Sequence, residues 1–265
     1  MATIRPMAVA GLFYPSKPQE LRQEVQTLFS EVKKAPPFKA GNLKALIVPH
    51  AGIIYSGLTA AYGYRLLQEK TPAPQRIVLL GPSHHAWIEG LALSHYQSFA
   101  SPLGSVPIDQ AAIKKLEGFS QVSLAEATHT QEHSLEVQLP FLQMMLEKFS
   151  LIPFAVGEAS PQAIAEILNV LWGGPETMIL ISSDLSHYLA YQAAKIKDAA
   201  TIRNILDLRF LNEDNQACGA VPINGLIEIA KQRHLKPELI DYRNSGDTAG
   251  DKFRVVGYSS IAFYE

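Results

Sequence analysis

Side chains that can bind metals follow three apolar segments of the sequence, at the point where each segment ends. They are His50 after residues 43–48, His84 and His85 after residues 76–80, and Asp184 and His187 after residues 177–182. The three segments are almost continuously apolar, which is typical of strands that are covered on both faces of a sheet. Ligands of parallel α/β sheets bind beyond the carboxyl ends of the strands. We therefore expect these side chains to meet at one edge of a sheet.

Imidazole and carboxylate groups together suit divalent iron, zinc, copper or manganese. Two histidines and one anionic ligand, with coordination positions left open, are typical of non-haem Fe(II) oxygen chemistry. A zinc hydrolase would need similar parts, namely three protein ligands and a water molecule. Cys218 is the single cysteine and precedes a predicted helix. It could supply a thiolate there, or it could be a small buried apolar residue.

The other histidines are less clearly placed. His85 could orient His84 or a substrate. His133 and Glu136 are three residues apart at the start of a predicted helix and so share a face; they are candidate pocket groups or a capping arrangement. Three histidines lack a comparable setting and are predicted to be structural or surface residues, namely His95, His129 and His234.

Strands and helices alternate along most of the chain. The predicted strands span residues 43–48, 76–80, 151–156, 177–182, 239–244 and 253–264, and the predicted helices span residues 18–32, 56–70, 109–116, 134–149, 161–172, 192–208 and 221–234. This order predicts an α/β layered sandwich with a mainly parallel mixed central sheet. No break in composition marks a boundary, so we expect residues 1–265 to form a single domain.

The composition excludes several classes of protein. Of 265 residues, 47% are hydrophobic and 18% are charged, and the formal net charge is −2. These values argue against a disordered chain and against a nucleic-acid-binding protein. No apolar run is long enough to cross a membrane. A single cysteine forms no intrachain disulfide, which fits the cytoplasm. The sequence also lacks the motifs of serine hydrolases, P-loop NTPases, dinucleotide-binding dehydrogenases and zincin proteases.

The segments that carry these residues resemble, in the same order, the motifs of the Memo family, whose bacterial and archaeal members are called AmmeMemoRadiSam system protein B. The matching segments are residues 11–15, 48–57, 81–85, 132–136, 182–187, 218–219 and 256–258. The resemblance covers nearly the whole chain, and the motifs are specific when taken together. It implies a fold similar to the catalytic subunit of class III extradiol dioxygenases, which are non-haem iron enzymes.

The resemblance also implies roles for individual residues. His50 and His84 match the metal-site histidines of the family, and Cys218 matches its metal-site cysteine, which replaces the carboxylate ligand of the dioxygenases. Asp184 and His187 match pocket residues, with His187 the counterpart of the acid/base histidine. The implied cofactor is Fe(II) or copper, with zinc as an alternative. The implied companions are AMMECR-type and radical-SAM proteins.

Together these observations predict a cytoplasmic metal-dependent redox enzyme that takes a small molecule or a peptide into the metal pocket. His50, His84 and Cys218 would hold the metal. Asp184 would orient a ligand or bind metal-bound water, and His187 would transfer protons to oxygen or the substrate. Two alternatives belong to other classes. One is a non-catalytic adaptor that uses the same pocket for binding, and the other is a zinc-dependent hydrolase.

Overall fold

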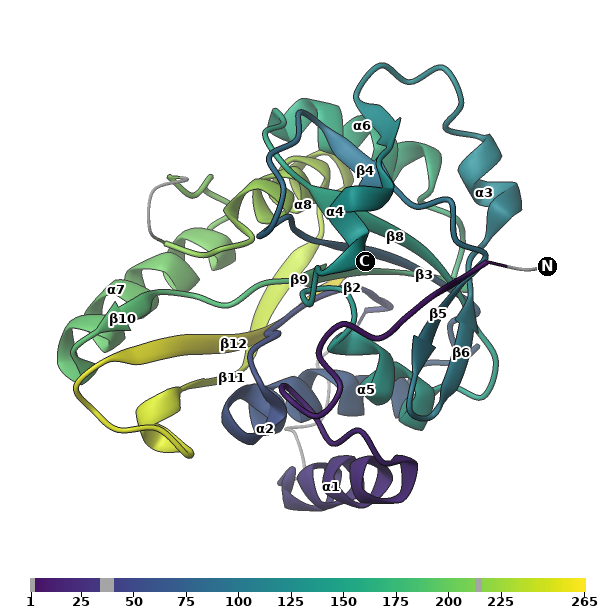
Figure 1. Cartoon of the computed structure of the whole chain (residues 1–265). Helices are drawn as coiled ribbons and strands as arrows, with labels where there is room; N and C mark the ends of the chain where they lie inside the picture. Colours follow the sequence, from purple (N-terminus) through teal and green to yellow (C-terminus); the bar gives the residue numbers. More distant parts are fainter. Residues whose placement is uncertain (1–2, 34–40, 213–215) are drawn as a thin grey trace.

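The apolar segments predicted as strands lie side by side in one mixed sheet of the computed structural model, which describes residues 3–33, 41–212 and 216–265 (Figure 1). The order of the strands is β10 (His187–Leu189), β12 (Val255–Tyr264), β2 (Leu43–Val48), β9 (Thr177–Ser182), β3 (Arg76–Pro82), β8 (Ser150–Val156), β4 (Leu91–Leu93) and β7 (Val122–Leu124), and β11 (Lys236–Asn244) also pairs with β12. β2, β9, β3 and β8 are parallel neighbours, whereas β12 and β4 run antiparallel to them. The predicted α/β class with a mixed central sheet is confirmed.

Side chains of the central strands alternate between two apolar cores, one on each face of the sheet. In β9, Ile179 and Ile181 belong to one core, and Met178 and Leu180 belong to the other. Every residue of β2 and β9 is buried. This arrangement explains the continuously apolar sequence, because both sets of alternating side chains face a layer of helices.

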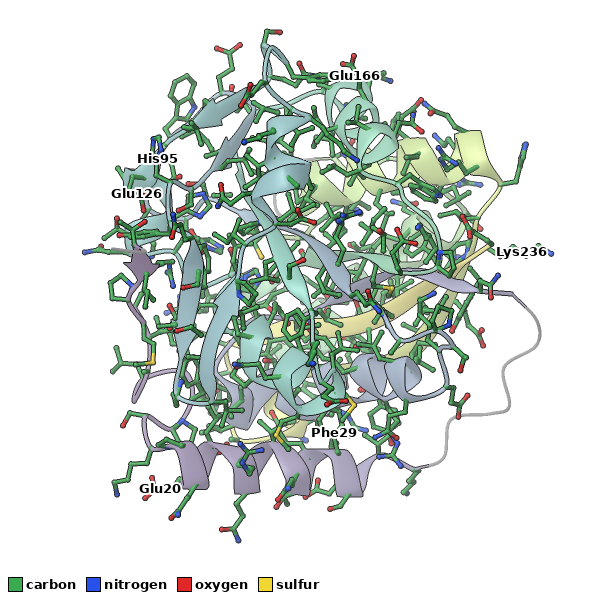
Figure 2. All side chains as sticks on the ribbon, turned by 90° about the vertical axis from the view of Figure 1, so that its right-hand side faces the viewer. Glu20, Phe29, His95, Glu126, Glu166 and Lys236 are labelled. Atoms are coloured by element: carbon green, nitrogen blue, oxygen red, sulfur yellow. The ribbon has the colours of Figure 1, made fainter. Side chains whose placement is uncertain are left out.

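The helices form the two outer layers. Their bounds are α1 (Pro18–Glu31), α2 (Ile53–Arg65), α3 (Gln110–Lys114), α4 (Glu126–Thr130), α5 (Gln138–Met145), α6 (Pro161–Val170), α7 (Tyr191–Leu206) and α8 (Ala220–Arg233), with short 3-10 turns at Leu66–Gln68 and Ser245–Asp247. α6 and α8 contribute to one core, and α1, α2 and α5 contribute to the other. In Figure 2, α1 forms one border of the molecule, with Phe29 on its buried side and Glu20 on its exposed side.

A second, three-stranded sheet lies beside the main one. It consists of β1 (Ile4–Arg5), β5 (Ser98–Ser101) and β6 (Gly104–Pro107). β1 pairs in parallel with β5, and β5 pairs antiparallel with β6. These strands, like β4, β7 and β10, were not predicted from the sequence, because segments of two to four residues carry little periodic signal. The pairing of β1 with β5 holds the N-terminal segment against residues 98–99.

The helix predicted over residues 134–149 begins only at Gln138. Pro140 therefore lies in the first turn of α5, where its missing N–H would have no partner within the helix in any case. Residues 132–137 stay outside the α-helix, and this affects the direction of the side chains around His133. Among the described residues, no helix is both long and apolar enough to span a membrane.

Candidate metal centre

The carboxyl ends of β2, β9 and β3 bring the predicted side chains together. β9 lies between β2 and β3, and all three strands are parallel. The backbone N–H of His50 donates to Oδ1 of Asp184 at 2.8 Å, and the ring centroids of His50 and His84 are 5.3 Å apart. The shared edge expected from the ends of these segments is thus present.

Three imidazoles form a compact group at this edge. One nitrogen from each of His50, His84 and His133 lies within 4.8 Å of the other two, so the group could hold a metal ion. The ring of His133 stacks on that of His84 at a centroid distance of 4.6 Å. The sequence analysis placed His133 only among the candidate pocket groups. Residues 134–137 form a turn before α5, so the direction of the His133 side chain could not be read from a helix that begins at residue 134.

Glu132 orients His84 through hydrogen bonds. It was not singled out as a candidate site residue from the sequence. This buried carboxylate accepts from the His84 backbone N–H at 2.6 Å, from the His84 Nδ1 at 2.9 Å and from the Ser134 backbone N–H at 2.8 Å. Although burial raises the pKa of Glu132, these hydrogen bonds and the charge of His84 hold that pKa at about 2. The ionised carboxylate can only accept, so Nδ1 of His84 carries a hydrogen, and Nε2 is the nitrogen with which this ring can bind a metal.

Replacing this carboxylate should weaken metal binding. We expect Glu132→Gln to lower the affinity for zinc(II) by roughly 10–100-fold, which is the usual effect of removing the outer partner of a metal-binding histidine. The reason is that an amide can turn its NH₂ group toward His84 and release the ring. A competition titration with a chromophoric chelator measures the effect. Glu126→Gln is a suitable control, because Glu126 accepts from the His95 backbone away from the group. An affinity equal to that of the unmodified protein would contradict this role for Glu132.

Two of the three imidazoles, those of His50 and His133, are kept neutral by their surroundings. Burial, followed by the charge of His84, lowers the pKa of His50 to about 3. Burial, followed by the charge of His50, lowers the pKa of His133 to about 4. Neutral imidazole is the form that binds metals, so both rings have lone pairs to offer at neutral pH. Three imidazole nitrogen atoms fit a divalent transition metal such as zinc, iron or copper.

Cys218 lies next to this group but is not a member of it. Its sulfur is 3.3 Å from Nε2 of His50 and accepts from the backbone N–H of Asp184 at 3.2 Å. Burial and the neighbouring Asp184 carboxylate raise the pKa of the Cys218 thiol far above its usual range. Without a metal, the thiol is therefore protonated at neutral pH.

The protonated thiol predicts slow alkylation. In the metal-free protein, we expect Cys218 to react with iodoacetamide at pH 8 at least about tenfold more slowly than free cysteine, because only the thiolate is nucleophilic. Raising the pH to 9 should leave the reaction slow, since the pKa lies above this interval. Mass spectrometry over time measures the rate. Urea-unfolded protein is the control and should react at the rate of an ordinary thiol; equal rates in the two states would contradict the prediction.

The two residues predicted to be catalytic, Asp184 and His187, occupy different environments. Asp184 is buried, and burial raises its pKa, while the His50 N–H bond opposes that change. His187 is exposed at the first residue of β10, and its charge lowers the pKa of both Asp184 and His50. His85 is also exposed, with its ring centroid 6.1 Å from that of His133. Asp184, His187 and His85 therefore lie near the three-histidine group.

Glu136 faces away from the three histidines. Its carboxylate forms an ion pair with Arg5 and accepts from the Tyr14 hydroxyl and from the backbone N–H groups of Ala8 and Val9. The same guanidinium donates to the backbone oxygens of His129 and Glu132. This pair therefore anchors residues 5–14 beside the site.

The anchored segment forms one wall of a depression of about 500 Å³ that reaches His133. The depression is lined by Ala8, Val9, Phe13, His85, Thr130, Gln131 and His133. The rings of Phe13 and His133 are 4.7 Å apart. Space for a small ligand thus lies between the three-histidine group and the N-terminal segment.

The remaining histidines lie outside the group. His95 is exposed next to Glu126 at the edge of the molecule (Figure 2). His129 is buried, and its Nε2 contacts the Ala92 oxygen at 3.0 Å. His234 is exposed and ends α8 with a left-handed backbone conformation. The prediction that these three are structural or surface residues is consistent with their positions.

Comparisons with known proteins agree with these features. A family model described as "Memo-like protein" matches residues 5–262. The chain is 32% identical to a "MEMO1 family protein" of Metallosphaera sedula, covering 97% of this chain and 98% of the relative. It is 35% identical to one of Aquifex aeolicus, covering 98% and 99%, respectively.

The fold is also similar to a known structure. The crystal structure of an uncharacterized protein from Escherichia coli K12 superposes with a TM-score of 0.53 at 15% identity, over 83% of this chain and 99% of that chain. This likeness concerns the fold alone. The order of the motifs, the family match along nearly the entire length and the identities above 30% lead to one conclusion: the chain belongs to the Memo family.

Proposed function

We propose that this Memo-family chain is a non-haem metal-dependent redox enzyme of the dioxygenase-like kind. The observation that carries the proposal is the group of His50, His84 and His133, whose ligand atoms lie within 4.8 Å of one another. Imidazole donors with further coordination positions left open suit Fe(II) or copper, which we propose as the cofactor. When bound, such a metal supplies the electron transfer that none of these side chains can perform.

Cys218 is proposed as a further ligand on the His50 side. The distance from the Cys218 sulfur to Nε2 of His50 is 3.3 Å. The two atoms are thus neighbours, and both thiolate and imidazole would suit a transition metal. This proximity supports the role implied by the family motif.

The other residues of the site position groups or move protons. Asp184 fixes the backbone of His50 through its 2.8 Å hydrogen bond and so holds the ring at the edge of β2. Glu132 holds the His84 ring through Nδ1. His187 is exposed, and we propose that its imidazole carries a proton between the substrate and the solvent, as general acid–base catalysis requires.

The depression next to His133 is the proposed substrate pocket. Its walls include Ala8, Val9 and Phe13, whose apolar side chains exclude water from one side of a bound molecule. The proposed occupant is a small molecule with a flat apolar part, or a peptide side chain of that kind. Its polar end would point toward the three histidines.

Oxygen uptake tests the proposed function. Protein purified without oxygen and loaded with Fe(II) or copper is mixed with a panel of catechols and thiols, and oxygen consumption is recorded. We expect turnover that disappears in His50→Ala/His84→Ala and falls about 10²–10⁴-fold in His187→Ala, the range that general acid–base groups contribute. If the protein consumes no oxygen with Fe(II) and none with copper, the redox proposal is refuted. Binding of a panel compound in that pocket without turnover would favour the adaptor alternative.

A zinc hydrolase is a second candidate because three histidines are also a ligand set of catalytic zinc. Two measurements separate it from the redox enzyme. A hydrolase would retain zinc through purification, and its turnover would be the same with and without oxygen.

We further propose that the protein works in the cytoplasm with AMMECR-type and radical-SAM companion proteins. The single cysteine and the family motifs support this proposal. Recovery of these companions with a tagged form of the chain, from the cells that encode it, is the test.

A further inference from the structure

The hydroxyl of Ser182, at the end of β9, connects His50 to a buried polar network behind the three-histidine group. Its Oγ is 2.9 Å from Nδ1 of His50, 2.6 Å from the backbone oxygen of Ser134 and 2.7 Å from Nε2 of Gln138. All four residues are buried. With no solvent to exchange partners, each hydrogen in this network must have one defined place.

The direction of the Gln138 amide follows from its other contacts. Nε2 lies 2.9 Å from the backbone oxygen of Pro49, which can only accept, so this end of the side chain must be the NH₂ group. The opposite end, Oε1, accepts from the Tyr64 hydroxyl at 2.8 Å. Gln138 therefore donates to Ser182.

The remaining hydrogen can now be located by counting. A serine hydroxyl has one hydrogen and two lone pairs. The Ser134 carbonyl takes the hydrogen, because it can only accept, and the Gln138 amide occupies one lone pair. The second lone pair faces Nδ1 of His50, which must therefore carry a hydrogen. The free lone pair of His50 is consequently on Nε2, the nitrogen that lies 3.3 Å from the Cys218 sulfur.

We propose that Ser182 and Gln138 are positioning residues that fix His50 in the Nδ1–H tautomer and thereby direct its Nε2 lone pair toward the metal. The proposal rests on the proposed function in one respect, namely that the group bound by this lone pair is a metal. The tautomer itself is a property of the metal-free protein. Metal-binding histidines commonly donate their other N–H to a fixed acceptor. In this protein the acceptor for His84 is the Glu132 carboxylate. The acceptor for His50 is the Ser182 hydroxyl, which is itself fixed by hydrogen bonds to Ser134 and Gln138.

Nitrogen NMR of the metal-free protein with ¹⁵N-labelled histidine tests the proposal directly. The signals of His50 are assigned by their loss in His50→Gln. In the unmodified protein, we expect a single neutral tautomer of His50 with the hydrogen on Nδ1. In Ser182→Ala, Nδ1 loses its acceptor, so we expect the hydrogen to move to Nε2, where the Cys218 sulfur can accept it. Zinc(II) affinity, measured separately, should fall by roughly 10–100-fold in this variant.

Tyr64→Phe is the matched control. It removes a buried hydroxyl from the same network, but Ser182 keeps all three of its partners, and the Pro49 carbonyl still orients Gln138. We expect the His50 tautomer to stay unchanged in this variant. A purely structural role for the network would give both variants similar effects.

Three results would overturn the inference: a hydrogen on Nε2 of His50 in the unmodified protein, an unchanged tautomer in Ser182→Ala, or an equal change in Tyr64→Phe. The first needs no variant, so the test holds even where Ser182→Ala fails to fold. If the tautomer is as expected but the protein binds no redox metal, the proposed function fails and the inference about Ser182 stands.

Discussion

Protein with the double substitution His50→Ala/His84→Ala is expected to contain no stoichiometric metal after purification without oxygen. Two of the three nitrogen donors that lie within 4.8 Å of one another are then missing, and Glu132 and Ser182 have no ring left to orient. Because the loss of an outer partner alone costs about 10–100-fold in metal affinity, removal of two ligands should cost more than about 100-fold. Elemental analysis gives the occupancy, and a zinc(II) competition titration gives the change in affinity.

His85→Ala is the control for this experiment. His85 is adjacent to His84 in sequence and is exposed, but it does not belong to the three-histidine group. It should keep the metal occupancy of the unmodified protein. Full occupancy in the double variant would be incompatible with the proposed centre.

The single variants His133→Ala and Cys218→Ala complete the series by comparing the other two proposed ligands. His133 belongs to the three-histidine group, whereas the Cys218 sulfur lies 3.3 Å from Nε2 of His50. We expect both substitutions to weaken binding. The substitution that lowers the metal affinity more identifies the stronger of the two ligands. Unchanged affinity in either variant would exclude that residue as a ligand.

Breaking the buried ion pair between Arg5 and Glu136 should have the largest effect on stability. The two side chains are 1% and 0% exposed, so Glu136→Gln leaves a buried guanidinium without its counter-charge. We expect the free energy of unfolding to fall by about 3–5 kcal/mol, as is usual when one partner of a buried pair is removed. The melting temperature should fall by on the order of 10 °C. Urea denaturation and calorimetry measure the two quantities.

Lys17 and Glu20 offer a control of the same chemistry at the surface. Their side chains are 75% and 57% exposed and form an ion pair at 2.7 Å. Solvent already screens this pair, so Glu20→Gln should leave the melting temperature unchanged. If Glu136→Gln were equally harmless, the buried pair would not anchor residues 5–14, and the wall of the depression would need another support.

Several features of the protein follow from local sequence alone. The apolar segments 43–48, 76–80 and 177–182 predict buried parallel strands, and the polar side chains directly after them predict a site at the carboxyl edge. Both predictions need only the periodicity of strands and the direction of parallel sheets. The motifs that carry the family resemblance lie in these same segments, so fold class and family were both predictable.

The two glutamates of the segment 132–136 show what local sequence does not determine. Spacing along a helix would put His133 and Glu136 on one face. In the structure, Glu132 instead binds His84 and Glu136 binds Arg5, 131 residues away. The reason is that these residues precede α5, and contacts with distant segments determine where their side chains lie.

The longer strands and helices, the family, and the edge at which His50, His84 and Asp184 meet were thus predictable from the sequence. Which side chains complete the centre depends on the tertiary structure. His133 enters through a loop, Cys218 arrives from a segment 168 residues away from His50, and Ser182 receives its hydrogen-bond partners from α5 and the preceding loop. These contacts depend on strand order and on the satisfaction of buried polar groups, which are properties of the packed chain and not of any segment of it.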